Sequence, residues 1–158
     1  WIQELQEEHT PETDEYGISS FVFRARRPFH PARFWDFIHT EWEGLLRSKG
    51  YFWLASRNDI AVSWAQAGGS AEYRPAGYWW ASVPSSQWPD DDQTWNAISK
   101  EWEDPHGDRR QELVFIGQEL PKEEMLLALN TCLLTDVEFE AGLEVWNKLP
   151  DPFPRWTE

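Results

Sequence analysis

Sulfur-containing residues are almost absent from this chain of 158 residues, which has one cysteine, Cys132, and one methionine, Met125. A lone cysteine excludes an internal disulfide bond and a zinc site built from several thiolates. Cys132 lies in the apolar run MLLALNTCLL, so we expect a buried core thiol. Because the chain starts at Trp1 rather than at a methionine, we expect it to be part of a longer protein.

Long apolar runs are also missing. No stretch reaches the roughly 20 apolar residues that a membrane-spanning helix requires. The acidic start, with Glu4, Glu7 and Glu8, lacks the basic residues of a secretion signal. These absences predict a soluble, cytoplasmic protein with no membrane partner, and its length fits one ordinary domain.

Basic residues are scarce relative to acidic ones. The chain has 14 Lys and Arg against 28 Asp and Glu, which gives a formal net charge of −14. Nucleic-acid binding depends on cationic side chains that displace counterions from phosphates, so this balance argues against a nucleic-acid partner. Six acids and no base lie in residues 1–16, which we interpret as an acidic interdomain linker.

Catalytic and metal-binding motifs are absent as well. Neither a phosphate-binding loop GxxxxGK[ST] nor a nucleophile elbow GxSxG occurs. The four histidines, His9, His30, His39 and His106, lack the HxxxH, HExxH or HxH spacing that places two imidazoles on one ion. We expect no enzyme activity, no cofactor and no metal site in this chain, with His9 as a weak metal candidate. The enzyme alternative would need a deep pocket that holds a group with a strongly shifted pKa.

Aromatic residues, by contrast, are abundant, with twelve tryptophans and nine phenylalanines. At this density most of them must form the core, and an exposed subset would mark a docking or ligand surface. One alternative is therefore a small-ligand or carbohydrate-binding module in which Trp64, Trp79 and Trp80 form an aromatic platform. That alternative requires the three rings to be open to solvent.

Hydrophobic periodicity predicts an α+β fold. The expected strands are 18–27, 51–56, 60–67, 77–83 and 111–118, and the expected helices are 31–46, about 90–102, one opening at Pro121 and a short one capped by Thr135. This order resembles a split βαβ, ferredoxin-like layout, a mixed sheet of about four to five strands with helices mainly on one face.

Cationic residues gather near the expected strands. They are Arg24, Arg26, Arg27, Arg33, Arg47, Lys49, Arg109 and Arg110. One interpretation pairs them with the protein's own carboxylates, such as Glu112, Asp36 or Glu43. The other is an arginine-lined face that grips a carboxylate, a phosphate or an acidic partner surface through forked hydrogen bonds.

Several distinctive blocks run in order from about Glu15 to Glu138: EYGISSFVFRARRPFHPARFWDF, RSKGYFWLASR, SWAQAGG, YWWASVP, GDRRQELVFIGQEL and LLALNTCLLTDVE. Together these blocks resemble one known family, the CobW carboxy-terminal domain of CobW-type P-loop GTPases. The resemblance implies a domain at 17–138, followed by a carboxy-terminal extension at 139–158.

In that family a GTPase domain with a cysteine metal motif precedes this domain, and the pair is associated with delivery of zinc or cobalt, as in cobalamin synthesis. The resemblance implies GTP and a divalent metal for the full-length protein. This part would dock on its own GTPase domain or on a metal-receiving client protein. From charge and motif position we select an interaction face of Arg26, Arg27, Arg47, Lys49, Trp53, Trp80, Arg109 and Gln111.

Overall fold

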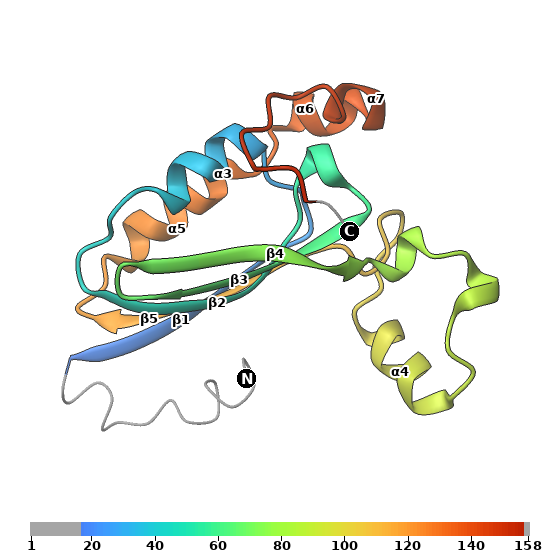
Figure 1. The fold of residues 1–158 in the computed structure, drawn as a ribbon, viewed down its shortest axis with the longest axis horizontal. Coiled ribbons are helices and arrows are strands. Elements are labelled where there is room, and N and C mark those ends of the chain that lie inside the picture. Colours follow the sequence, from blue (N-terminus) through green and yellow to red (C-terminus); the bar gives the residue numbers. More distant parts are fainter. Residues whose placement is uncertain (1–16, 157–158) are drawn as a thin grey trace.

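Five strands form one antiparallel sheet in the order β1-β5-β2-β3-β4 (Figure 1). The computed structural model describes residues 17–156. The strands are β1 (Ile18–Ala25), β2 (Leu45–Phe52), β3 (Ile60–Ala67), β4 (Ser70–Tyr78) and β5 (Gln111–Gln118).

The first three elements form a split βαβ unit. β1 leads through helix α3 (Pro31–Ile38) to β2, and β5 inserts between these two strands, antiparallel to both. β1 and β2 therefore run parallel to each other but are not hydrogen-bonded neighbours. For this reason every strand pairing in the sheet is antiparallel, whereas the prediction had a mixed sheet. The predicted fold class is confirmed.

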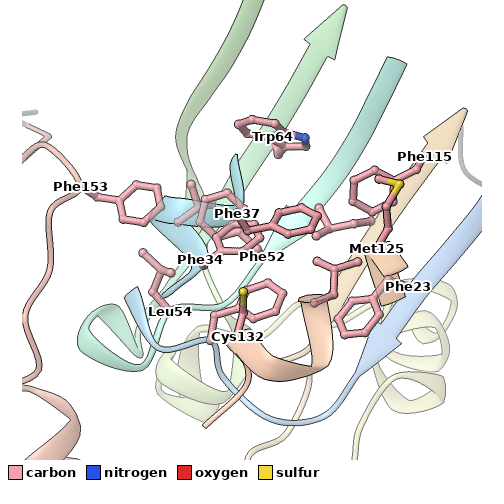
Figure 2. Packing of buried hydrophobic residues seen from close by; sticks show 14 of the residues in the cluster. Phe23, Phe34, Phe37, Phe52, Leu54, Trp64, Phe115, Met125, Cys132 and Phe153 are labelled. Carbon is pink, nitrogen blue, oxygen red and sulfur yellow. The ribbon is translucent and has the colours of Figure 1, made fainter. Parts of the chain in front are cut away.

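Helices α3 and α5 (Lys122–Cys132) cover one face of the sheet (Figure 1). The core between the helices and the sheet is largely aromatic, because Phe115 of β5 meets Phe37 of α3 and Phe52 of β2 meets Phe34 of α3 (Figure 2). Met125, Leu129 and Cys132 close it from the side of α5, so the predicted burial of the thiol is confirmed.

Several element boundaries match the sequence patterns closely. β1, β3 and β5 start and end within two residues of their predicted limits, and β5 is paired on both edges as a central strand. Helix α4 (Asp92–Lys100) has Asp91 as its N-cap, and helix α6 (Asp136–Ala141) carries the predicted capping box.

Two of the predictions around β2 were wrong. The helix expected at 31–46 ends at Ile38, and Leu45 already begins β2, which also ends before most of the strand expected at 51–56. Gly44 takes φ +87° and packs against the backbone of Gln118, a contact that favours glycine. Pairing with β5 overrides the helical spacing of the aromatic residues in 31–46.

The strand expected at 77–83 was also wrong. β4 occupies the polar segment before it, and Trp80–Ser82 form a 3-10 turn, η2. Ala67 pairs with Ser70, so Gly68 and Gly69 form the tight turn of a hairpin. β4 has no alternation of hydrophobic residues because it is an exposed edge strand.

The carboxy-terminal residues belong to the folded body. Helix α7 (Leu143–Trp146) buries Trp146 in a second cluster with Trp53 and Trp79, next to the 3-10 turn η1 (Ala55–Arg57). Phe153 is 3% exposed and packs against Phe34 in the main core (Figure 2). The extension at 139–158 is thus packed on the domain as far as it is described. A further 3-10 turn, η3 (Ser85–Gln87), precedes α4.

Replacing Gly50 with alanine should destabilise the sheet strongly. Gly50 has φ +148°, and an added Cβ would overlap the carbonyl oxygen of Glu112 on the neighbouring strand. We expect Gly50→Ala to lower the free energy of unfolding by about 2 kcal/mol or more in a urea titration. The control is Gly69→Ala in the hairpin turn, where a Cβ meets nothing and φ is not in the left-handed region. Equal stability of the two variants would contradict the packing of β2 against β5.

Candidate docking face

The sheet has one face that no helix of residues 17–156 covers, and we call it the open face. Paired residues on neighbouring strands share a face. A set of paired residues across the strands forms a row. The row that contains Phe21 and Phe115 points to α3, so the rows next to it along the strands point to the opposite face. The open face thus carries the side chains opposite to the core.

One row of the open face runs across all five strands. Its members, in register, are Arg24, Glu112, Tyr51, Ser63 and Arg74. Tyr51 is 46% exposed, and the Arg24 and Arg74 side chains are 54% and 66% exposed. The row therefore presents a tyrosine between two guanidinium groups, residue types that often dominate binding energy at protein interfaces.

Two neighbouring rows add the cations of β2. Lys49 is paired with Val114 and Ala65, and Arg47 is paired with Ile116 and Ala67. Both cations are exposed. Their partners on either side are small or aliphatic, so the ends of these long side chains lie over an apolar strip of the sheet.

The carboxylates of the open face are paired with its arginines. Arg24 Nε donates to Glu112 Oε1 at 3.2 Å, and Arg74 lies 3.1 Å from Glu72. Among residues 17–156 the face presents four cationic side chains, Arg24, Arg47, Lys49 and Arg74, and the two carboxylates Glu72 and Glu112. Cationic side chains of this kind are complementary to an acidic surface.

A hollow of about 370 Å³ adjoins the open face, and we call it the α4 hollow. Tyr51 and Tyr78 line it from the sheet, Trp80 lines it from η2, and Ile98 lines it from α4. Arg110 also lines it and donates to the Asp108 carbonyl oxygen at 2.9 Å. Tyr51 belongs to both the row and the hollow, so the two form one continuous surface.

The remaining residues of the predicted interaction face are structural. Gln111 is fully buried: its Oε1 accepts from the Trp53 backbone N–H at 2.8 Å, and its Nε2 donates to the carbonyl oxygens of Trp53 and Arg27. Trp53 is also fully buried and donates its ring N–H to Asn58 Oδ1 at 2.8 Å. Neither Gln111 nor Trp53 presents its side chain to a partner in this structure.

Arg109 and Asp108 attach the segment that carries α4 to the sheet. Asp108 accepts the backbone N–H groups of Trp80 and Ala81, both at 2.9 Å. Arg109 donates to the Asn58 carbonyl oxygen at 2.8 Å and to the Ser82 hydroxyl. Burial lowers the pKa of Arg109, whose side chain is only 10% exposed. The Arg109 guanidinium group therefore binds groups of the protein itself.

Arg26 and Arg27 are likewise bound to the protein itself. Arg26 Nη1 donates to the Glu101 carbonyl oxygen at 2.6 Å and to that of Gly107 at 3.2 Å. Arg27 Nη1 donates to Asp136 Oδ1 at 2.8 Å and to the Leu134 carbonyl oxygen at 3.1 Å. Of the predicted face, only Arg47, Lys49 and the half-buried Trp80 lie on the open face or in the adjoining α4 hollow.

The aromatic platform is not formed. Trp64 is 5% exposed and donates its ring N–H to the Ser48 hydroxyl at 2.7 Å, while Trp79 is 6% exposed. Two of the three rings that a platform would need are therefore buried in the core clusters.

Residues 17–156 contain no group of three His, Cys, Asp or Glu side chains that converge as metal ligands. No helix of residues 17–156 is long and apolar enough to cross a bilayer. His9, the weak metal candidate, and the linker 1–16 lie outside the described residues.

The interaction face selected from the sequence omits Arg24, Tyr51 and Arg74, which lie on the open face. Arg47, Lys49 and Tyr51 alternate at period two, a pattern typical of the outward side of a strand. The residues just before this pattern, Leu45 and Leu46, fit the helical spacing of segment 31–46, so the start of the strand is not recognisable from the sequence.

Gln111→Ala should test the structural role of Gln111. The substitution removes the partner of the buried Trp53 N–H and of the Arg27 carbonyl oxygen, while the Trp53 carbonyl oxygen keeps only its bond from the Phe29 N–H. We expect it to lower the free energy of unfolding by about 2–4 kcal/mol, measured by urea denaturation. Gln118→Ala, at the exposed end of the same strand, is the control and should cost less than about 0.5 kcal/mol. A cost for Gln111→Ala as small as that of the control would exclude the network.

The Arg33–Glu138 pair gives a pH-dependent prediction. Arg33 Nη2 donates to Glu138 Oε1 at 2.6 Å, and this hydrogen bond is the largest cause of a pKa lowered to about 2. The pair therefore stabilises the fold above the ordinary pKa of 4.5 and loses its effect as the pH falls toward 2.

We expect Glu138→Gln to cost about 1–2 kcal/mol at pH 7, with the difference from the unmodified chain vanishing in acid. Thermal unfolding from pH 7 to pH 2 measures it, with exposed Glu140→Gln on the same helix as the control. A difference that persists unchanged in acid would mean that the charge is not responsible.

Comparisons with known proteins identify relatives of this chain. A family model described as the cobalamin synthesis protein cobW C-terminal domain matches residues 18–133. A zinc-regulated GTPase metalloprotein activator of Dictyostelium discoideum is 42% identical over 156 residues, which cover 96% of this chain and 33% of that protein. A zinc chaperone of Mycobacterium tuberculosis is 33% identical over 140 residues, 88% of this chain and 35% of that protein.

The fold also has a counterpart among solved structures. The Zn(II)-bound YjiA GTPase from E. coli superposes with a TM-score of 0.53 at 17% identity, over 80% of this chain and 33% of that one. At that identity the match concerns the fold alone. This chain spans about a third of the length of the curated relatives that it matches.

Proposed function

Because this chain belongs to the family of cobalamin synthesis protein CobW carboxy-terminal domains, we propose that it acts by contact, as the docking domain of a zinc-regulated GTPase. The resemblance noted in the sequence is confirmed by the family match over 18–133. The docking partner we propose is an upstream GTPase domain of the same protein, and the surface is the open face.

The observation that carries this proposal is the exposed stripe of the sheet. Arg47, Lys49 and Tyr51 point away from the core in alternate positions, and no helix of residues 17–156 covers them. An uncovered sheet face with exposed aromatic and cationic side chains is typical of a surface that a partner occupies. Its cationic side chains favour an acidic surface on that partner.

We propose that the full-length protein uses GTP and zinc. The names of the relatives support zinc rather than cobalt, since they describe a zinc-regulated activator and a zinc chaperone. A client that receives the metal is a further possible partner for the same surface. In this proposal the present chain supplies neither a phosphate cradle nor a thiolate cluster, and it responds to the nucleotide state of its neighbour.

The titratable groups with the largest pKa shifts support a non-catalytic role for this chain. The pKa of Glu138 is lowered mainly by Arg33, and burial raises the pKa of the Cys132 thiol to about 12. A thiol with so high a pKa is a poor nucleophile near neutral pH. Neither residue lines the α4 hollow, so neither shift indicates an active site there.

Charge reversal on the open face tests the docking proposal. The upstream GTPase domain is expressed as a separate polypeptide, and its affinity for this chain is measured by calorimetry at two salt concentrations. We expect Arg47→Glu with Lys49→Glu to weaken binding about tenfold or more and to reduce the salt dependence, because like charges would then face each other. Tyr51→Ala should weaken binding without changing the salt dependence.

The matched control reverses two exposed cations on the helical side, Lys122→Glu and Lys148→Glu, and should leave the affinity unchanged. GTP turnover is followed in the same samples. We expect none from this chain alone and a changed rate for the GTPase domain when the chain is bound. Unchanged affinity in the open-face variants would rule out this face, and GTP turnover by the isolated chain would refute the non-catalytic role.

A further inference from the structure

A second hollow lies where the carboxy-terminal segment meets the β3–β4 hairpin, and we call it the C-terminal hollow. It shares Gly77 and Tyr78 with the lining of the α4 hollow. Its volume is about 360 Å³. Ile60, Pro75 and Tyr78 line it from the hairpin, and Arg57, Arg155 and Trp156 line it from the other side. This size is at the lower end of the range for ligand pockets, about 300–1,000 Å³.

A buried ion pair holds the wall of this hollow in place. Arg57 and Asp151 are each 7% exposed in their side chains, and Arg57 Nε donates to Asp151 Oδ2 at 2.8 Å. Arg57 also donates to the carbonyl oxygens of Phe153 and Pro154, at 2.6 and 2.8 Å. The carboxy-terminal segment is therefore fixed to η1 through several hydrogen bonds of one guanidinium group.

The same guanidinium group positions the aromatic wall. The Arg57 Cζ lies 4.4 Å from the centroid of the Trp156 ring, within the range of a cation–π contact. The Trp156 ring also meets Tyr73 edge to face at 6.3 Å. These contacts hold Trp156 as a preformed, half-buried wall of the hollow.

The charged side chains that line the C-terminal hollow are all positive. Its charged lining residues are Arg57 and Arg155, and no carboxylate lines it. Asp151 compensates the charge of Arg57. Arg155 is exposed and has no ion-pair partner within residues 17–156, so its charge is available at the hollow. In contrast, the α4 hollow is lined by Glu101 and Asp108 as well as by a cation.

A large aromatic side chain stands open beside this cation. Tyr78 is 62% exposed although it borders an apolar hollow. Tyrosine, tryptophan and arginine together are the residue types that most often carry the binding energy of an interface. β4 is an edge strand, and Pro75 lacks an N–H group, which weakens the pairing of an added strand and favours recognition by side chains here.

We propose that the C-terminal hollow binds an acidic peptide segment of a partner protein, in which an apolar side chain is followed or preceded by a carboxylate. The apolar side chain fills the space between Trp156, Ile60 and Pro75. The carboxylate binds the Arg155 guanidinium, whose forked donors suit it. Arg155 does not line the α4 hollow, so its contact with the carboxylate is tested independently of the proposed function.

Two synthetic peptides test the proposal on the ¹⁵N-labelled chain. One is the acidic probe Ac-GDLEFDG-NH₂, and the other is its neutral counterpart Ac-GNLQFNG-NH₂. We expect saturable NMR shifts with the acidic peptide at the Trp156 ring N–H, the Arg155 side-chain N–H and the Tyr78 amide. The neutral peptide should bind about tenfold more weakly, as should the acidic peptide to Arg155→Ala.

Lys148→Ala removes one exposed cation outside the hollow and is the matched control, which should bind the acidic peptide as the unmodified chain does. Tyr78→Ala should weaken binding of both peptides, since it removes apolar contact rather than charge. Three outcomes would overturn the proposal: no saturable shifts, equal shifts with both peptides, or shifts centred on Arg47 and Lys49 of the open face.

Discussion

The insertion of β5 between β1 and β2 is the constraint on which the rest of the structure depends. The three strands come from distant parts of the chain, and the carboxamide of Gln111 closes their junction by bonding both backbone groups of Trp53 and the carbonyl oxygen of Arg27. A buried amide with three good partners tolerates little displacement. It therefore fixes the start of β5, the register across the sheet and, with them, which residues reach the open face.

The cations divide into two groups according to this geometry. Arg26, Arg27 and Arg109 lie at strand ends, where they bind carbonyl oxygens that loops leave unpaired. Arg47 and Lys49 lie within β2, where neighbouring strands already satisfy the backbone. The side chains of these two residues follow the alternation of the strand and therefore point to the open face.

Much of the fold follows from local patterns. The alternation in β1, the apolar run of β5 and the capping residues of α4 and α6 predict these elements because short-range periodicity and end chemistry decide them. The pattern failed at 39–56, where aromatic residues at helical spacing belong to a loop and a strand. It also failed at β4, whose exposed residues have no reason to alternate. Both errors arise where pairing with another strand outweighs local preference.

The sequence by itself determined the family, the α+β class, the aromatic core with its buried thiol and the likeness to a GTPase-associated domain, since these depend on composition and ordered motifs. Only the tertiary structure decided that Trp53 and Gln111 are internal, that Trp64 and Trp79 form no platform, and that Arg47, Lys49 and Tyr51 share one uncovered face. It also brought Arg155 and Trp156 to the β3–β4 hairpin. The physical reason is that exposure and proximity depend on contacts between residues far apart in the chain, which no local pattern encodes.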